Sequence, residues 1–384
     1  MEPFAWTPSR HRGDRAGIGG PADRRCPEAS SCRRFHYGTV TSCFFPRSPF
    51  RWRSTFVSLQ QASATGAPTQ RAKWISVVAS RRDEDRSRLN ALAENLANAT
   101  CTPFLGSGAS APHIPTGREL AADWARRFGY PFPDTENLAR VMQFVATTTY
   151  SGDADSLKQR VVSEHFDKSA EPDFTAPHQV HRVLAECQLP LYVTTNYDDF
   201  MFRALEQTPE RRPRRDISPW YGPGPHDGHP PSPVGRGGYR PSADEPLVFH
   251  LHGHRNLARS LLLTEDDNID YLVREAGDSR SRGRPYVIPR YIRGQLRTTP
   301  LLFLGYSLQD WTFHVLFRRL LEGANKRNHV SVQFDPAHAA TAPACLYWEQ
   351  YLRSQNIWVF WETTETFMRK LVTRLRRMRG DGRP

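Results

Sequence analysis

Short apolar runs alternate with helical stretches along most of this 384-residue chain, and this alternation constrains the fold more than any other feature. The runs have the length of buried strands and lie at 102–105, 191–194, 247–251, 301–304, 330–332 and 357–360. Residues at helical spacing separate most of them, at 118–128, 137–147, 178–187, 199–207, 308–321 and 364–377. Parallel neighbouring strands need a crossover, which a helix supplies. The pattern therefore predicts an α/β fold, a doubly wound, mostly parallel Rossmann-like sheet.

Two intervals are too long to be simple crossovers. Residues 111–187 separate the first two predicted strands and are rich in helical spacing. They are predicted to contain a small inserted helical module. Residues 208–246 hold many Pro, Gly and Arg residues without a clear period, which predicts a long excursion on the surface.

The net charge of +12 is carried by the two ends of the chain. Basic residues exceed acidic ones by ten in residues 1–82 and by six in residues 369–384, so residues 83–368 have a net charge of −4. The Arg/Pro/Ser-rich extension 1–82 is predicted to be disordered. It could instead be a basic arm that touches nucleic acid, or an upstream extension outside the working protein. We expect nucleic-acid contact only through these basic ends.

Other compositional features exclude further classes of protein. The longest apolar runs are strand-sized, which predicts no membrane-spanning helix. The six cysteines form no C-x-x-C pair, which argues against a zinc ribbon. A disulfide scaffold is not expected in so long a chain. A reduced, cytoplasmic location fits these features best.

The first predicted strand runs into five small residues: Gly106, Ser107, Gly108, Ala109 and Ser110. Glycines at such a place let the backbone approach a pyrophosphate, and exposed N–H groups can bind the anion. The full dinucleotide-binding fingerprint is absent, so a structural turn of small residues explains the segment equally well.

The second predicted strand runs into polar residues, among them Thr194, Asn196 and Asp198. Ligands of open α/β sheets bind at the carboxyl ends of strands, so these side chains are candidates for ligand contact. The alternative is that Asn196 and Asp198 cap the helix that begins near Asp199.

The third predicted site segment, residues 247–254, ends in three closely spaced histidines. No carboxylate or cysteine stands beside them at metal-ligand spacing, so no metal site is predicted. The more specific interpretation is that one of these histidines is a general base, because histidine titrates near neutral pH. His252, beside Gly253, is better placed for it than His250, which could be a satisfied core residue.

Two further segments complete the candidates. Residues 262–267 have the pattern of a strand that passes into a helix through a threonine cap and an acidic first turn, a structural role. After the apolar run at 301–304, Gly305 permits close backbone approach and Ser307 could bind a ligand or cap a helix. In a doubly wound sheet these strand ends converge on one crevice.

The order of these motifs resembles the SIR2-like domain, the sirtuin-related family common in bacterial anti-phage defence. The resemblance covers roughly residues 90–320 and depends on five segments, G-S-G-A-S, T-T-N-Y-D, H-L-H-G, L-T-E-D-D and L-G-Y-S-L-Q-D. It implies an NAD-binding domain over 83–368, flanked by the extension and by the basic tail 369–384.

The resemblance also implies roles for individual residues. The phosphate loop falls on Gly106 to Ser110, the T-Q-N-x-D motif on Thr194, Asn196 and Asp198, the catalytic histidine on His252, and the later dinucleotide loop on Gly305 and Ser307. Thr195 stands where the family usually has Gln. No cysteine lies between Cys187 and Cys345, where deacetylating sirtuins carry a zinc module. The resemblance therefore implies a zinc-free NAD hydrolase.

The function predicted in this way is NAD+ glycohydrolysis, with NAD+ as substrate and nicotinamide and ADP-ribose as products. An NAD-depleting effector would need control, so the resemblance implies a homo-oligomer or a separately encoded activator. Two alternatives stay open: an NAD-dependent protein deacylase, and a non-catalytic nucleotide-binding module.

Overall fold

The computed structural model describes residues 70–221, 231–234, 237–277, 286–306, 330–334 and 342–380. The chain divides into Met1–Gly66 and Ala67–Pro384, and the described residues all belong to the second unit. Residues 1–69 of the predicted extension and the predicted helix at 308–321 lie outside the described residues.

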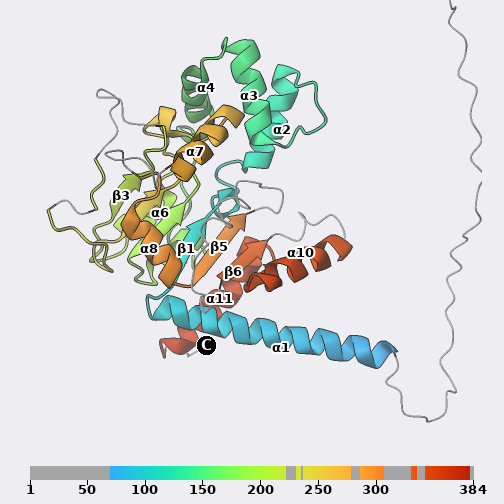
Figure 1. Cartoon of the computed structure of the whole chain (residues 1–384). Helices are drawn as coiled ribbons and strands as arrows, with labels where there is room; N and C mark the ends of the chain where they lie inside the picture. The colour runs from blue at the N-terminus through green and yellow to red at the C-terminus, as the bar shows by residue number, and fades with distance from the viewer. Residues whose placement is uncertain are drawn as a thin grey trace, which may run out of the picture. The chain divides into compact units, whose positions relative to one another are not determined.

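A parallel sheet forms the centre of this unit (Figure 1). Its strands within the described residues are β1 Thr102–Leu105, β2 Leu191–Thr194, β3 Arg214–Ile217, β4 Leu247–His250, β5 Leu301–Tyr306, β6 Val330–Phe334 and β7 Ile357–Trp361. Their order is β3-β4-β2-β1-β5-β6-β7, and each of these neighbouring pairs is parallel. The predicted doubly wound Rossmann-like α/β fold is confirmed.

Both faces of the sheet are buried, which explains why the strands read as continuous apolar runs. In β5, Leu301 and Phe303 belong to one hydrophobic cluster, whereas Leu302 and Leu304 belong to the other. The second of these clusters takes in α1 Gln70–Ala97, α5 Val180–Ala185, α6 Phe200–Glu206 and α11 Thr364–Met378. The first takes in α7 Glu265–Gly277, α8 Arg290–Thr298 and α10 Ala342–Ser354.

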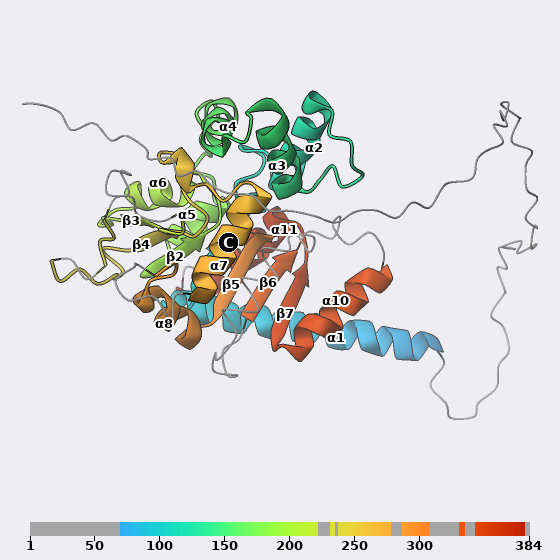
Figure 2. The same ribbon diagram turned by 45° about the horizontal axis from the view of Figure 1, so that its top comes forward.

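A group of short helices follows β1 and lies beside one end of the sheet (Figure 2). It contains α2 Gly117–Phe128, α3 Leu138–Thr149, α4 Ala154–Val161 and the π-helical turn η2 Val162–Phe166. We call residues 117–166 the helical module. Thr116 and Glu119 start α2 with a reciprocal capping box, and Gly129 ends it in the left-handed conformation. The later helix α5 packs against α6 and α11 and so belongs to the layer that covers the sheet.

The structure corrects the expectation that 208–246 is wholly a surface excursion, because β3 lies within it. Among the described strands, β3 pairs only with β4, at the edge of the sheet. It begins with Arg214, which is exposed, and Arg215, which is partly buried. Edge strands tolerate charged side chains, so β3 lacks the apolar run that identifies the central strands.

Two other boundaries differ from the sequence expectations. The helix α1 begins at Gln70, inside the segment 1–82 predicted to be disordered, because no Pro or Gly interrupts the sequence from 70 to 97. Residues 262–263 are buried but form no strand, although the helix α7 follows them as predicted. Among the described helices, α1 included, none is both long and apolar enough to cross a bilayer.

The carboxyl end of β1 occupies the point where the strand order reverses. The strand pairs with β2 on one side and β5 on the other, and these two neighbours follow it at different points along the chain. Ligands of doubly wound sheets bind at such a switch point. The fold therefore gathers the loops after β1, β2 and β4 at one edge, beside the carboxyl end of β5.

Replacing Gly305 tests the contact between the loop after β1 and the carboxyl end of β5. The residue has a φ of +73°, and a Cβ there would lie 2.2 Å from the Ala109 amide nitrogen. We expect Gly305→Ala to lower the free energy of unfolding by about 2 kcal/mol or more, measured by urea denaturation. In the control Gly294→Ala, on the exposed side of α8, the new methyl meets no atom within 4 Å. In the control, the free energy of unfolding should instead rise by up to about 1 kcal/mol. Equal effects of the two changes would show that the close packing at Gly305 does not matter for stability.

Candidate active site

The loop after β1 packs directly against the carboxyl end of β5, backbone to backbone. The Gly106 N–H donates to the Leu304 carbonyl at 2.8 Å. A Cβ added to Gly106 would lie 2.8 Å from the Gly305 carbonyl oxygen, and one added to Gly108 would lie 2.9 Å from the Gly305 Cα. The structure thus brings these three predicted glycines together. Because they lack a side chain, the loop after β1 can pack closely against the end of β5. Ser307 lies outside the described residues.

A short 3-10 helix, η1 Ser107–Ala109, follows Gly106. The first amide groups of a helix have no acceptor within it, and Ser107 and Gly108 occupy these positions. Ser107 is exposed and Gly108 is partly buried, whereas Ala109 and Ser110 are buried. The N–H groups of Ala109 and Ser110 are used within the turn, at 2.9 Å and 3.1 Å from the carbonyls of Gly106 and Ser107.

A hydrogen-bond chain links the loop after β1 to the loop after β2. The Asn196 Nδ2 donates to the Ser110 Oγ at 2.9 Å and to the Gly106 carbonyl at 3.0 Å. The Ser110 hydroxyl in turn donates to the Asp198 Oδ2 at 2.7 Å. Because all three side chains are buried, this chain fixes the amide of Asn196 at the switch point.

Asp198 caps a helix, one of the two roles that the sequence left open, and it also belongs to the hydrogen-bond chain. Its Oδ1 accepts the Phe200 N–H at 2.9 Å and so caps the start of α6, while its Oδ2 belongs to the chain from Ser110. Burial raises the pKa of Asp198 to about 6, although these two hydrogen bonds oppose the rise. The carboxyl group therefore changes charge close to neutral pH.

Thr194 and Thr195 turn the chain after β2. The Thr194 Oγ1 accepts the Asn196 N–H at 2.9 Å and lies 3.3 Å from the Leu105 carbonyl. The Thr195 Oγ1 lies 3.2 Å from the hydroxyl of Tyr306. Thr194 is therefore a support for Asn196, whereas no sequence pattern indicated the contact between Thr195 and Tyr306.

His252 lies just beyond β4, at a position that matches Asn196 on the neighbouring strand. The last paired residues are Thr194 and His250, and Asn196 and His252 each follow two residues later. His252 is 8% exposed, and its Nε2 has no hydrogen-bond partner among the described residues. Burial lowers the pKa of His252 to about 3. The imidazole is therefore neutral at physiological pH, and a ring nitrogen without a partner can make a hydrogen bond with a ligand or a water molecule.

His250 lies deeper, as the sequence suggested. It is 1% exposed, and its Nδ1 lies 3.3 Å from the Asn196 carbonyl. Burial holds the pKa of His250 well below its ordinary value. A carbonyl can only accept, so this Nδ1 carries the proton and donates. His250 therefore supports the backbone of Asn196.

Asp199 is a buried charge centre that sequence reasoning missed. Its carboxylate contacts Arg215, the His254 Nε2 at 2.8 Å and the Arg255 Nε at 2.9 Å. Burial alone would raise its pKa, but the hydrogen bond from His254 and the charges of Arg215 and Arg255 hold the pKa of Asp199 well below its usual range. The adjacent carboxylates Asp198 and Asp199 thus differ in electrostatics, and no sequence pattern distinguishes them.

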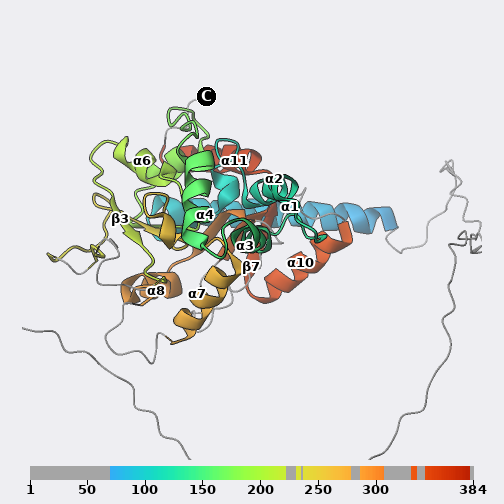
Figure 3. The ribbon, with the colours of Figure 1, turned by 90° about the horizontal axis from the view of Figure 1, so that it is seen from above.

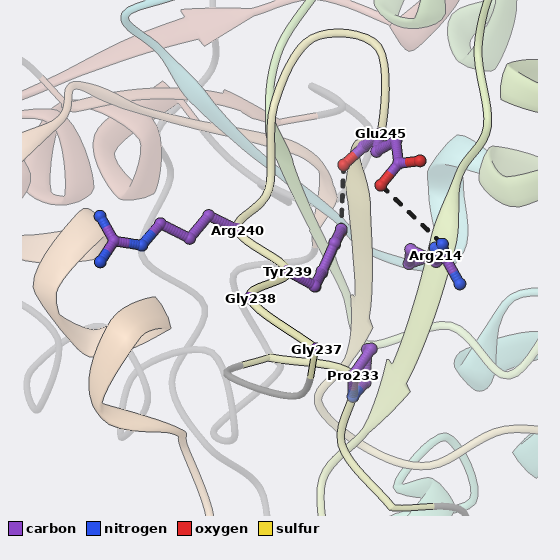
Figure 4. A pocket seen from close by; sticks show the side chains of 7 residues that line it. All are labelled: Arg214, Pro233, Gly237, Gly238, Tyr239, Arg240 and Glu245. Carbon is purple, nitrogen blue, oxygen red and sulfur yellow. Dashed lines mark hydrogen bonds and ion pairs between the residues drawn. The ribbon is translucent and has the colours of Figure 1, made fainter.

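A cavity of about 560 Å³ lies elsewhere, beside the edge strand β3 (Figure 4). It is lined by Arg214, Pro233, Gly237, Gly238, Tyr239, Arg240 and Glu245. Within it Glu245 pairs with Arg214 at 3.8 Å and accepts the Tyr239 hydroxyl at its carbonyl, at 3.0 Å. None of the predicted site residues lines this cavity, so the strand ends are the better candidate for chemistry.

The site combines a neutral base with a carboxyl group that titrates near neutrality. Contacts connect Gly106, Gly108 and Ser110 with Asn196, Asp198 and Gly305. His252 follows the last paired residue of β4 by two positions, as Asn196 does on β2, and no contact between His252 and this group is seen among the described residues. No cluster of His, Cys, Asp or Glu in the described part of the chain could hold a metal ion.

Two solved structures of Sir2 proteins resemble the chain. One, from work on the mechanism and regulation of Sir2 enzymes, has 15% sequence identity and a TM-score of 0.38, covering 76% of this chain and 98% of that chain. The other, a mutant Sir2 homologue in complex with 2'-O-acetyl ADP-ribose, has 15% identity and a TM-score of 0.37, covering 75% and 96%. Likenesses at this level carry no argument about the ligand. A search of curated proteins gives no match.

A family comparison agrees with the motifs at the strand ends. The model of the SIR2-like domain matches residues 190–356, which include the strand ends of β2, β4 and β5 with Asn196, His252 and Gly305. The glycine loop after β1 precedes the matched segment and joins it through the contacts of Asn196 and Gly305. Residues 190–356 therefore match the SIR2-like domain that the motifs resemble.

Proposed function

We infer that this protein is an NAD+ glycohydrolase, which consumes NAD+ and water and releases nicotinamide, ADP-ribose and a proton. The SIR2-like domain supports an NAD-using enzyme at the level of the family. The observation that carries the finer proposal is His252, a buried, neutral imidazole at the switch point whose Nε2 has no partner among the described residues. A buried nitrogen without a partner is costly unless a substrate or water supplies one.

The strand ends suit a dinucleotide. The amides of Ser107 and Gly108 at the start of η1 would bind the pyrophosphate, since free N–H groups at a helix start attract anions. The close contact of Gly106 and Gly108 with Gly305 keeps this loop in a single position. The position of Ser307 in the sequence, just after β5, leaves it as a further predicted contact.

Cleavage of the nicotinamide–ribose bond needs little help from a general acid. It depends more on the groups that hold the ribose. Nicotinamide in NAD+ is already cationic, so it leaves without protonation, and positive charge builds on the ribose as in other glycosidic cleavages. Asn196 would orient the ribose or the attacking water through its amide. His252 would accept the proton that the water loses. Asp198 would hold Asn196 through Ser110 and supply nearby negative charge.

Two rival functions would use the same residues at the strand ends. A protein deacylase would consume an acylated peptide together with NAD+, but the sequence has no cysteine between Cys187 and Cys345 to build the zinc module of deacetylating sirtuins. A non-catalytic nucleotide-binding module would bind NAD+ without turnover. The position of His252 just beyond β4, together with a ring nitrogen that has no partner among the described residues, supports catalysis over binding alone.

We propose further that the protein depletes NAD+ as an effector of anti-phage defence, the context in which its family is common. Such an activity would kill the host if it were unregulated. Control would come from assembly into a homo-oligomer or from a separately encoded activator. Light scattering of the purified chain, with and without neighbouring gene products, tests this: a monomer that is equally active in every condition would exclude both.

Removing either reacting side chain tests the proposed function. We expect Asn196→Ala and His252→Ala each to slow nicotinamide release by about a hundredfold or more. A positioned base contributes about that much, and misplacing a reactant costs about as much. Chromatography of the products would measure the rate, and circular dichroism would establish that each variant folds. Acylated peptide should leave the rate unchanged.

His178→Ala is the matched control for the histidine change. His178 also has a buried ring nitrogen without a partner among the described residues, but it lies near Arg369 and Arg376 of α11, and no contact with a predicted site residue is seen in the described part of the chain. It should keep the wild-type rate. If His252→Ala and Asn196→Ala were as active as this control, the assignment would be wrong.

The pH dependence distinguishes the two titrating groups. Asp198, with a pKa of about 6, is ionised above that pH and accepts from Ser110, whereas His252 stays neutral down to about pH 3. We therefore expect kcat/KM to fall below about pH 6 as Asp198 gains one proton. Asp198→Asn should be slower and should lose this step. A step that persists in Asp198→Asn would mean that another group, such as His252, titrates there.

A further inference from the structure

The first residues of α7 are tied to the helical module by polar contacts. The Arg140 Nε donates to Glu265 at 3.0 Å. Gln143 exchanges two hydrogen bonds with Asp266, at 2.9 Å and 3.1 Å. The helices α3 and α7 pack side by side, as the view from above shows (Figure 3). The acidic first turn that the sequence assigned to helix capping is therefore also the contact with the module.

A third contact between the helical module and α7, the ion pair of Lys158 with Asp267, is buried. The Lys158 Nζ of α4 lies 2.6 Å from the Asp267 Oδ1, and the two side chains are 4% and 10% exposed. The Asp267 Oδ2 also accepts the N–H groups of Leu263 and Thr264, at 2.9 Å and 2.8 Å. The Lys158 ammonium lies 5.3 Å from the ring centre of Trp220. A buried carboxylate with these partners cannot lose its cation without a large penalty.

The segment that Asp267 holds is continuous with His252. We call residues 251–264 the His252 loop. The Leu262 N–H donates to the His252 carbonyl at 2.9 Å. Gly253, with a φ of +92°, is so close to Ser260 that an added Cβ would lie 2.0 Å from the Ser260 carbonyl oxygen. The ring of Tyr271 on α7 meets the His252 ring edge to face, with centres 5.9 Å apart.

The module contacts this loop at two more points. The helix α4 packs against η3 Ala258–Ser260, the short turn within the loop. The Arg255 Nη1 donates to the carbonyl of Phe166, the last residue of η2, at 3.0 Å. The backbone that carries His252 is thus fixed from the module side as well as from β4.

We propose that Lys158 is a positioning residue for His252. Through Asp267 it fixes both the His252 loop and the start of α7, and so the imidazole and the Tyr271 ring that packs against it. This inference rests on the proposed function, in which His252 accepts the proton. No contact of Lys158 with Gly106–Ser110 is seen among the described residues, so its loss should slow the chemical step and leave dinucleotide affinity nearly intact.

The test removes the ion pair while leaving no buried charge unpaired. We expect Lys158→Met/Asp267→Asn to fold, because the side-chain amide oxygen introduced by the second change can still accept from Leu263 and Thr264. Its kcat for nicotinamide release should fall about tenfold to a hundredfold, since small misplacements of a reacting group cost that much. Its KM for NAD+ should change less than about threefold if binding is untouched. The single variant Lys158→Arg keeps a cation opposite Asp267, so its kcat should fall less than that of the double variant.

Arg126→Met is the matched control within the same module. It removes a cation that is 75% exposed and that pairs, within the described part of the chain, with Asp123 of the same helix. This variant should keep the wild-type kcat and KM. Wild-type kcat in the folded double variant would overturn the proposal. So would a loss confined to KM, or a loss that Lys158→Arg does not reduce at all.

Hydrogen exchange separates this proposal from the proposed function. The double variant should exchange amide protons faster in residues 251–264 than the wild type does, with residues 106–110 unchanged. If the wild type released no nicotinamide, the proposed function would fail, while faster exchange in the loop would still support the positioning role. Unchanged exchange in the loop would overturn the positioning role whatever the activity.

Discussion

Parallel pairing of β1 with β2 on one side and β5 on the other is the constraint on which the rest of the site depends. It puts the carboxyl ends of these strands, and of β4 beyond β2, at one edge of the sheet. The loops that leave this edge are then close enough to share hydrogen bonds, as Asn196 does with Gly106 and Ser110. Glycine at 305 allows the closest of these approaches. The site is thus a consequence of strand order, and its side chains come from segments far apart in sequence.

Burial then gives similar side chains different chemistry. Asp198 and Asp199 are neighbours, yet desolvation raises the pKa of Asp198 to about 6, while three basic partners hold the pKa of Asp199 well below its usual range. His252 and His254 differ in the same way. The Nε2 of His254 is bonded to Asp199, whereas the Nε2 of His252 has no partner among the described residues. Of these four residues, His252 is proposed as the base and Asp198 as the group that holds Asn196, whereas His254 and Asp199 are paired with each other.

The sequence was a good guide where a residue's role depends on local pattern. The apolar runs identified the central strands because those strands are buried on both faces, and small or polar residues after them identified the loops of the site. The strand β3 escaped prediction because an edge strand tolerates the charges of Arg214 and Arg215. The proposed positioning role of Lys158 could not be predicted either, because it depends on the contact with Asp267, 109 positions away in the sequence. Long-range pairs of this kind leave no spacing to read in a single sequence.

The most direct measurement is the product balance when the purified chain meets NAD+ without any acylated peptide. We expect one nicotinamide and one free ADP-ribose for each NAD+ consumed, because in the proposed reaction water accepts the ADP-ribosyl group. Chromatography with mass detection would resolve both products. Intact NAD+ that is bound but never cleaved, even with the neighbouring gene products present, would contradict the account. So would consumption of NAD+ only when an acylated peptide is added.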